Sequence, residues 1–160
     1  TEPAAAMCLT KEYPNLLDSD DARLVAENTV DTCHYLWQMH EKGQLELDLQ
    51  PIVTTVGYHL PCHLRALAQP ATGENLIKLI PGLVVQQLDH GCSGMAGTFG
   101  FETEHYDISL SIGEQVLFPA IRSQSGDFQV VSEGVSCRQQ IEHGTGKRAR
   151  HLAEVLAEAL

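Results

Sequence analysis

The sequence predicts an α/β fold with three layers, in which a short parallel sheet lies between helices. Runs of β-branched and aliphatic residues near 52–58, 83–89 and 128–133 have the composition of buried strands. Each run is followed by a segment of helical composition, and strands that alternate with helices form parallel sheets through right-handed crossovers. A length of 160 residues is enough for one domain of this kind with its own core.

The first part of the chain, residues 1–45, is predicted to be helical. Residues 2–12 are rich in strong helix formers, and Pro14 is expected to end this short helix. A longer helix is expected over residues 20–41, because apolar side chains recur there at helical spacing and Gly43 supplies an end signal. Residues 1–45 therefore form a helical lead-in to the strands.

The remaining residues, 46–160, are predicted to hold the sheet and the helices that cover it. Helices are expected at residues 64–68, 74–80, 104–123, 138–143 and 148–160. The last of these is amphipathic, with Leu152, Val155 and Leu156 on one face. Each predicted strand is thus followed by at least one helix, as in a parallel sheet.

Charge and hydropathy exclude several classes of protein. Asp and Glu number 21 against 10 Lys and Arg, a net charge of −11, so no basic surface is available to bind the phosphates of a nucleic acid. No apolar stretch approaches the roughly 20 residues that a membrane-spanning helix needs. The chain starts at Thr1 with no secretory signal, so we expect a processed protein or a fragment of a longer one.

The cysteine content points to a reducing compartment. The chain has five cysteines, and an odd number without a secretory signal disfavours a disulfide framework. Reduced thiols fit a cytoplasmic protein better. Cys33 shares a helical face with apolar residues, and Cys8 lies between Met7 and Leu9, so both are expected to pack in the core.

The other cysteines, Cys62, Cys92 and Cys137, each follow a predicted strand and precede a predicted helix. In a parallel sheet such turns lie at the carboxyl ends of the strands, which is where open α/β sheets bind ligands. The amino ends of helices also favour thiolates. We therefore expect the three sulfur atoms to converge at one edge of the sheet.

Three converging thiolates favour a soft or borderline metal, so an iron–sulfur cluster or Zn²⁺ is the leading interpretation. Candidates for a fourth ligand are His63, His59 and His90. Ser93 is a weaker ligand, because its hydroxyl stays protonated at neutral pH. The alternative is a set of buried thiols and solvated histidines that bind no metal.

A loop over residues 91–100 has glycine at every third position, including Gly91, Gly94 and Gly97. These glycines are candidate cofactor-binding positions, because glycine allows positive φ and brings backbone N–H groups close to an anion. Around a cluster, such donors would hydrogen-bond the sulfurs and raise the reduction potential. A phosphate-binding loop and a tight turn that requires small residues are the alternatives.

A nucleophilic pair of Cys62 with His63 or His59 is a further alternative, of the kind that hydrolases use. Adjacent residues on a turn rarely face one another, and no oxyanion-binding signature accompanies this pair. No catalytic residue is therefore assigned in this chain.

Taken together, residues 58–64, 91–100 and 137–142 resemble the cysteine-rich, or CCG, domain of iron–sulfur oxidoreductases. That family includes the B subunit of heterodisulfide reductase, the iron–sulfur subunit of glycolate oxidase and the C subunit of anaerobic glycerol-3-phosphate dehydrogenase. The same domain resembles the carboxyl end of large fused FAD-linked oxidases that act on 2-hydroxy acids.

The resemblance also has implications for domain organisation. Residues 2–14 are similar to the stretch that follows the first copy of this domain in tandem proteins. The resemblance therefore implies that residues 1–45 are the tail of a preceding repeat and that residues 46–160 are the cysteine-rich domain itself.

In the family, a single cysteine, a Cys-Cys-Gly and a Cys-x-x-Cys bind a [4Fe–4S] cluster, which is non-cubane in some members and replaced by zinc in others. The resemblance assigns Cys62, Cys92 and Cys137 to three of these ligand positions. Ser93 stands where the second cysteine of the pair would be, and Gly134 stands where the Cys-x-x-Cys would begin.

The function that the resemblance implies is electron transfer by a [4Fe–4S] cluster. Electrons would pass from FAD in a flavin dehydrogenase subunit or domain, of 2-hydroxy acid or glycerol-3-phosphate type, to a quinone or another carrier. The chain would be cytoplasmic, or peripheral at the inner membrane through its partner. One alternative is a metal-free or zinc-bound structural or docking domain with a degenerate cluster site. Another is a thiol–disulfide oxidoreductase that uses Cys62 and Cys92 directly.

Overall fold

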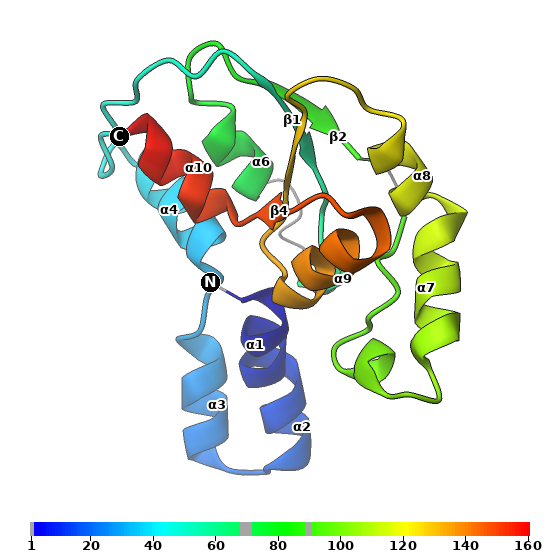
Figure 1. The fold of residues 1–160 in the computed structure, drawn as a ribbon. Helices are drawn as coiled ribbons and strands as arrows, with labels where there is room; N and C mark the ends of the chain where they lie inside the picture. The colour runs from blue at the N-terminus through cyan, green and yellow to red at the C-terminus, as the bar shows by residue number, and fades with distance from the viewer. Residues whose placement is uncertain (1, 68–71, 89–90) are drawn as a thin grey trace.

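The structure is a computed structural model that describes residues 2–67, 72–88 and 91–160. It confirms the α/β fold class, because the described residues form a four-stranded parallel sheet with helices on both faces (Figure 1). The strands lie in the order β2-β1-β3-β4. Their bounds are β1 (Thr55–Tyr58), β2 (Val84–Gln87), β3 (Gln129–Val131) and β4 (Ala149–Arg150).

The strand register aligns the carboxyl ends of the strands. Tyr58 lies opposite Gln87 of β2 and Val131 of β3. Arg150 in turn lies opposite Val131. The segments that leave these strands therefore start at the same edge of the sheet.

Helices connect the strands in the order of the chain. Two of them, α5 (Cys62–Ala66) and α6 (Thr72–Ile77), lie between β1 and β2. Two more, α7 (Tyr106–Gln115) and α8 (Leu117–Arg122), lie between β2 and β3. After β3 come α9 (Val135–Thr145), the short β4 and α10 (Leu152–Ala159).

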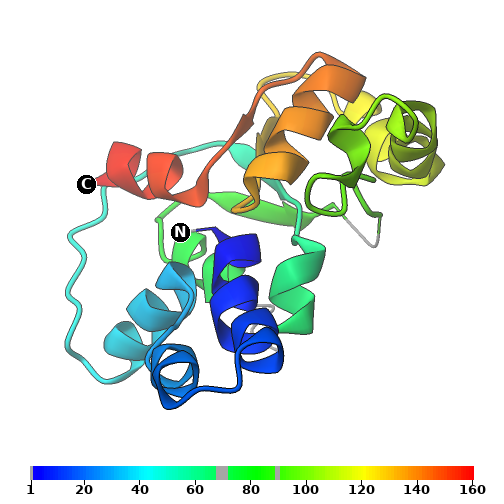
Figure 2. The same ribbon diagram turned by 90° about the horizontal axis from the view of Figure 1, so that it is seen from below.

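The sheet separates two hydrophobic clusters, so the fold has three layers. Val56, Tyr58 and Val131 pack with residues of α4 (Thr32–Glu41), α6 and α10 on one face. Val130 packs with residues of α8 and α9 on the other face. Figure 2 shows the cyan and green helices on one side of the sheet and the orange and yellow helices on the other. Adjacent strand residues thus point into different layers, as the period of a strand requires.

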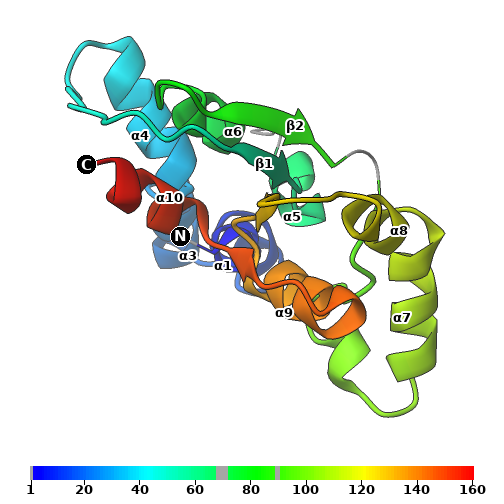
Figure 3. The same cartoon turned by 45° about the horizontal axis from the view of Figure 1, so that its top comes forward.

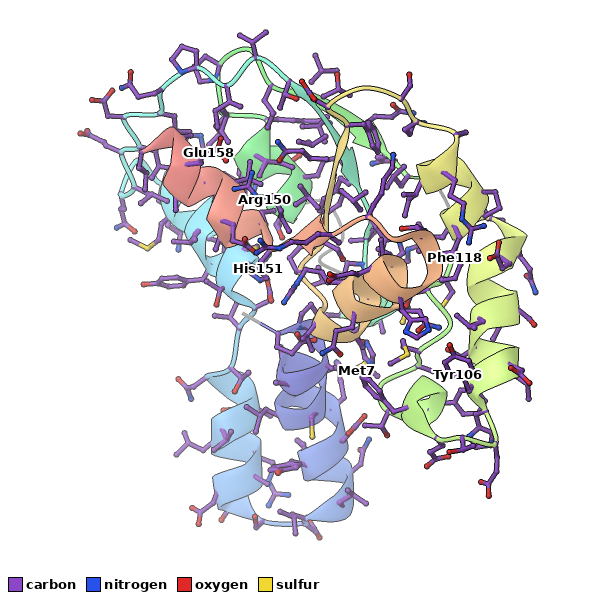
Figure 4. The ribbon with its side chains drawn as sticks, in the orientation of Figure 1. Met7, Tyr106, Phe118, Arg150, His151 and Glu158 are labelled. Carbon is purple, nitrogen blue, oxygen red and sulfur yellow. The ribbon has the colours of Figure 1, made fainter. Side chains whose placement is uncertain are left out.

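Phe118 joins the helices of the second layer. Its side chain is fully buried, and a Cβ atom on Gly113 of α7 or Gly144 of α9 would collide with its ring (Figure 4). The two glycines therefore allow α7, α8 and α9 to meet around one aromatic side chain.

In the first layer, Arg150 of β4 forms an ion pair with Glu158 of α10, with 2.7 Å between Nη1 and Oε2.

The first predicted helix does not end at Pro14. Instead α1 (Pro3–Met7) continues through a π-helical turn, η1 (Cys8–Glu12), into α2 (Tyr13–Leu16). Because the proline ring would clash with the carbonyl four residues earlier in an α-helix, a wider turn accommodates it. The Tyr13 N–H accordingly donates to the carbonyl of Cys8, five residues back.

The long helix predicted over residues 20–41 is in fact two helices. They are α3 (Asp20–Glu27) and α4, and Asp31 starts the second by accepting hydrogen bonds from the N–H groups of Cys33 and His34. The expected continuous apolar face is also wrong, because Leu24 is 61% exposed. A side-chain cap inside the segment competes with helix continuation.

Two further segments differ from the prediction. The helix predicted over residues 104–123 is divided into α7 and α8, because Val116 has φ −143° and ψ −54°. The helix predicted from residue 148 begins only at Leu152, because Ala149 and Arg150 pair with β3 as β4. The three predicted strands are present in shorter form as β1, β2 and β3.

The lead-in helices pack onto the part of the chain that holds the sheet. Helix α1 contacts α5, and α4 contacts α6 (Figure 3). Cys33 of α4 is buried in the first hydrophobic cluster, as expected, together with the partly buried Trp37. Cys8 is half-buried in the π-helical turn.

Within the described residues, no helix has the length and apolar character needed to cross a membrane.

Candidate functional site

The strand order places a topological switch point between β1 and β3. The chain leaves β1 toward β2 on one side, while β3 lies on the other side of β1. In open α/β sheets, ligands bind in the crevice outside the carboxyl ends of the strands at such a point. Cys62 follows β1, Cys92 lies in the connection after β2, and Cys137 lies in the first turn of α9 after β3. We call these three residues the rim cysteines.

Cys62 and Cys92 are an exposed, interacting pair of thiols. Both side chains are exposed, and each thiol shifts the pKa of the other. The Gly94 N–H also donates to the Cys92 sulfur over 3.3 Å. The neighbouring Cys62 thiol lowers the pKa of Cys92 to about 6, and the Gly94 N–H and the charge of Arg65 act in the same direction. The Cys92 thiol in turn raises the pKa of Cys62, so the pair favours a thiolate on Cys92.

Cys137 lies deeper than the other rim cysteines. Its side chain is buried, and burial raises the pKa of its thiol to about 11. The Ser93 hydroxyl donates to its sulfur over 3.5 Å. The charge of Cys137 also contributes to the raised pKa of Cys62, so the three thiols influence one another electrostatically.

The types of donor at the rim fit a thiolate-bound metal centre. Three thiols with a neighbouring hydroxyl form a soft donor set, which suits iron–sulfur clusters and zinc. Within the described residues, however, no three His, Cys, Asp or Glu side chains are grouped closely enough to hold a metal ion. The Cys62 and Cys92 thiols thus affect each other's pKa, while the Cys137 sulfur accepts a hydrogen bond from the Ser93 hydroxyl.

Ser93 and Gly134 both lie beside Cys137. Ser93 is 2% exposed, with its hydroxyl directed at the Cys137 sulfur. A Cβ atom built on Gly134 would lie 3.3 Å from that sulfur and 3.3 Å from Cγ of Pro61. A thiol at either position would therefore be a neighbour of Cys137.

Two of the loop glycines are required by close packing. A Cβ atom on Gly91 would lie 2.8 Å from the backbone nitrogen of Leu117, and one on Gly94 would collide with the carbonyl of Ser109. Gly94 also has φ +91°. This packing supports the interpretation as a tight turn, while the Gly94 N–H gives the same turn a donor to the Cys92 sulfur. Gly97 has φ +71° and meets no neighbour within 4 Å.

The candidate histidine ligands occupy different environments. His63 follows Cys62, and its Nδ1 is 3.8 Å from the Cys62 sulfur. His59 is 1% exposed, and burial lowers its pKa to about 4, so it is neutral at pH 7. Neither ring nitrogen of His59 has a hydrogen-bond partner among the described residues. His90 lies outside the described residues.

The sequence reasoning missed a buried acidic group next to the rim. Glu133 follows β3 directly, is 1% exposed and accepts a hydrogen bond of 2.8 Å from the Tyr58 hydroxyl. Burial raises the pKa of Glu133 to about 7, and the nearby charge of Asp31 acts in the same direction. The available signal was its position at the end of a strand, the same signal that identified the rim cysteines.

A second missed residue is Glu2. Its carboxylate accepts a hydrogen bond of 2.9 Å from the N–H of Val135 at the start of α9, and one of 3.4 Å from the N–H of Ala4 in α1. Its charge contributes to the raised pKa of Cys137. Glu2 thus connects the lead-in to the helix that holds Cys137.

Comparison with known proteins identifies the family. The profile of the cysteine-rich domain family CCG matches residues 56–142, which is more than half of the chain. Over 160 residues, the chain is 36% identical to the C subunit of anaerobic glycerol-3-phosphate dehydrogenase from Escherichia coli (strain K12), and it spans 39% of that protein.

A second group of relatives consists of longer proteins. The chain is 24% identical over 162 residues to D-2-hydroxyglutarate dehydrogenase of Pantoea ananatis, of which it covers 15%. It is 32% identical over 79 residues, 49% of its length, to 8% of the Escherichia coli (strain K12) protein of the same name. No solved structure matches the chain significantly. The resemblance that the motifs predicted is confirmed, and the chain belongs to the cysteine-rich (CCG) domain family.

Proposed function

We propose that this chain is an iron–sulfur electron-transfer domain of an FAD-linked oxidoreductase. The dehydrogenase names of the relatives favour glycerol-3-phosphate or a 2-hydroxy acid as the substrate of the flavin partner. FAD would be bound in that partner subunit or domain, and a quinone or another carrier would accept the electrons. The chain would act in the cytoplasm, or at the inner membrane through its partner.

The observation that carries this proposal is the placement of the rim cysteines at the switch point. Cys62, Cys92 and Cys137 follow three neighbouring parallel strands, and their thiols influence one another. They are the residues that would hold the [4Fe–4S] cluster, with His63 as a candidate fourth ligand. A bound cluster supplies one-electron redox chemistry.

The residues around the thiols would adapt the site to that chemistry. The Gly94 N–H would donate to a sulfur ligand, and donors to sulfur raise the reduction potential. Arg65 contributes positive charge near Cys92. Burial around Cys137 limits the access of water to one side of the site.

Anaerobic purification tests the proposal. We expect about four irons and about four acid-labile sulfides per chain, with broad absorbance near about 400 nm. Cys137→Ala should abolish iron retention. Cys8→Ser is the matched control, because Cys8 lies in the π-helical turn of the lead-in, and it should leave the iron content unchanged. Equal iron content in both variants would remove Cys137 from the ligand set.

A second candidate function is a structural or docking domain that binds zinc or no metal. The absence of thiols at Ser93 and Gly134 favours it over a full cluster site, and the lack of a three-residue metal-binding group in the described ranges favours its metal-free form. About one zinc per chain in a colourless protein would support a Cys₃His site. No metal after strictly anaerobic preparation would support a docking domain.

We also propose that residues 1–45 are the tail of a preceding repeat and that residues 46–160 are the cysteine-rich domain. The family profile supports this division, because its match begins at residue 56. The Glu2 carboxylate would then connect the end of one repeat to α9 of the next.

A further inference from the structure

We propose that a groove between α4, α10 and residues 44–50 binds the aliphatic chain of a small molecule whose head group is not anionic. This inference goes beyond the proposed function and does not rest on it. Residues 44–50, which we call the covering segment, lead toward the amino end of β1, whereas the rim cysteines lie at the carboxyl edge of the sheet.

The groove is lined by apolar side chains. Its volume is 280 Å³, and among the described residues only leucine and alanine side chains line it. Leu76 of α6, one of these residues, is fully buried, and α6 contacts both α4 and α10 (Figure 1). An apolar cavity of about 150 Å³ already stays dry and takes up benzene, so this groove has room for a longer hydrocarbon.

Helix α10 leaves the groove open on one side. Ala153 and Ala157 lie one turn apart on this helix, and both are exposed and line the groove. Because their side chains are small, a ligand can lie against the backbone of the helix. A concave apolar site of this kind is typical of ligand binding.

The covering segment forms another wall of the groove. Leu45, Leu47 and Leu49 line it and are half-buried, and they alternate with exposed polar residues. Such alternation is that of an extended chain. Figure 2 shows the segment as an extended cyan trace between α4 and the C-terminus.

Within the described residues, backbone hydrogen bonds hold the covering segment only at its two ends. The Gln44 N–H donates to the Met39 carbonyl over 2.8 Å, and the Gln50 N–H donates to the Ala159 carbonyl over 2.6 Å. Residues 45–49 make no backbone hydrogen bond to another described residue. A second cavity, of 410 Å³, also lies against this segment. Its middle part can therefore move outward without loss of backbone hydrogen bonds, which gives a ligand access to the groove.

The charges beside the groove disfavour an anionic ligand. Residues 41–48 carry the carboxylates of Glu41, Glu46 and Asp48 against the single cation of Lys42. A carboxylate or phosphate head group would be repelled there. A hydroxyl group can instead donate to a carboxylate and accept from a free backbone N–H of residues 45–49.

The test uses the full 160-residue chain, with 1-butanol, 1-hexanol and 1-octanol as probes. Calorimetry measures the affinities, and circular dichroism measures the thermal midpoint of unfolding. Each added CH₂ group should strengthen binding about fourfold. Octanol should raise the thermal midpoint, because it binds the folded state. A midpoint that octanol lowers or leaves unchanged would overturn the inference.

A variant that fills the groove locates the site. Ala157→Phe places a ring in the groove and should weaken octanol binding at least about tenfold. Ala5→Phe, at an exposed position of α1, is the matched control and should bind octanol as the unmodified chain does. Equal affinities of the two variants would show that octanol binds elsewhere.

A second pair of variants tests the head group. Octanoate should bind the unmodified chain more weakly than octanol does. Asp48→Asn should narrow this difference by up to about fivefold and leave octanol binding unchanged. Asp107→Asn, at an exposed position of α7, should leave the difference as it is. Octanoate that binds as tightly as octanol would overturn the choice of head group.

Two other occupants of the groove would give different results. Sedimentation with phosphatidylcholine vesicles that Ala157→Phe abolishes would assign the groove to a lipid surface. A dimer in analytical ultracentrifugation that the same variant dissociates would assign it to a second copy of the chain. Either result overturns the inference. Iron content does not enter this test, so a chain that binds octanol but no iron keeps the groove and rejects only the proposed function.

Discussion

Cys137 lies among neighbours that set how many sulfur ligands the rim can offer. Its thiol is 5% exposed, and the Ser93 hydroxyl donates to it over 3.5 Å. A Cβ atom on Gly134 would approach the same sulfur to 3.3 Å. Ser93 and Gly134 therefore both adjoin Cys137, and a thiol added at either position would lie beside this proposed ligand.

Adding both thiols is expected to increase retention of the cluster in air. The double variant Ser93→Cys/Gly134→Cys should hold more iron and sulfide per chain than the unmodified protein after the same aerobic exposure, because more thiolates bind the metal. Gly134 has φ −70°, which cysteine adopts without strain. Ser111→Cys, on the exposed face of α7, is the control for an extra thiol. Equal iron retention in all three proteins would contradict this prediction.

Glu133 is expected to make stability depend on pH near neutrality. Burial raises the pKa of its carboxyl from 4.5 to about 7 in the folded state, so the folded chain holds a proton that the unfolded chain releases. Stability from this group is present below pH 4.5 and falls as pH rises toward 7. The complete loss corresponds to about 3 kcal/mol.

The variant Glu133→Gln isolates this effect. An amide accepts the Tyr58 hydroxyl hydrogen bond as the protonated acid does, but it cannot ionise. We expect similar free energies of unfolding for variant and unmodified protein at pH 5, and a variant that is more stable by about 2–3 kcal/mol at pH 8. Urea unfolding at each pH measures the difference. Glu41→Gln, at the exposed end of α4, should leave the free energy of unfolding close to that of the unmodified protein at both pH values.

At the scale of elements, the N-terminal helices and the cysteine-bearing helices are held together by specific contacts. Helix α1 contacts α5, which begins with Cys62. Glu2 accepts the hydrogen bond of the Val135 N–H at the start of α9. The first N–H groups of a helix have no partner within the helix, so a carboxylate from another element stabilises them.

Removing this contact is expected to destabilise the fold modestly. Glu2→Ala should lower the free energy of unfolding by about 0.5–2 kcal/mol, the range for loss of a helix cap. The midpoint of urea unfolding measures the change. Glu41→Ala, which removes an exposed carboxylate at the last turn of α4, should have almost no effect. Equal shifts in the two variants would indicate that Glu2 acts only through its charge.

The strongest elements could be predicted from the sequence because their composition is distinctive. The β-branched and aliphatic runs at β1, β2 and β3 favour strands, although β2 lies at the edge of the sheet and is largely exposed. Strand β4 could not be found in this way, because two residues carry no periodicity and it exists only by pairing with β3. The break before α4 had a local signal, the Asp31 cap, which the apolar spacing on both sides concealed.

At the scale of the molecule, the sequence predicted where the rim cysteines lie because all parallel strands end at one edge. The contacts between side chains at that edge were less predictable. The contact between Tyr58 and Glu133 joins residues 75 positions apart, and the position of Cys92 depends on how a glycine loop packs against α7 and α8. Such contacts follow from the assembled layers, so local patterns do not specify them.

The packing of the whole chain predicts that residues 46–160 do not fold stably without the lead-in. Helix α4 contacts α6, and Cys33 shares a hydrophobic cluster with Leu76 and Ile77, both fully buried. Exposing a buried aliphatic side chain costs about 1.5–3 kcal/mol, and the total stability of a domain is about 5–15 kcal/mol. Losing this cover therefore removes a large share of the stability.

Two fragments test this prediction. A fragment of residues 46–160 should unfold without a cooperative transition and bind a hydrophobic dye. A fragment of residues 30–160 keeps the Asp31 cap and α4 over α6 and lacks the earlier helices, so it should unfold cooperatively but with a lower thermal midpoint than the full chain. Thermal unfolding followed by circular dichroism distinguishes the two. A fragment of 46–160 that unfolds as cooperatively as the full chain would show that the sheet needs no cover from α4, and that residues 1–45 are a separable unit.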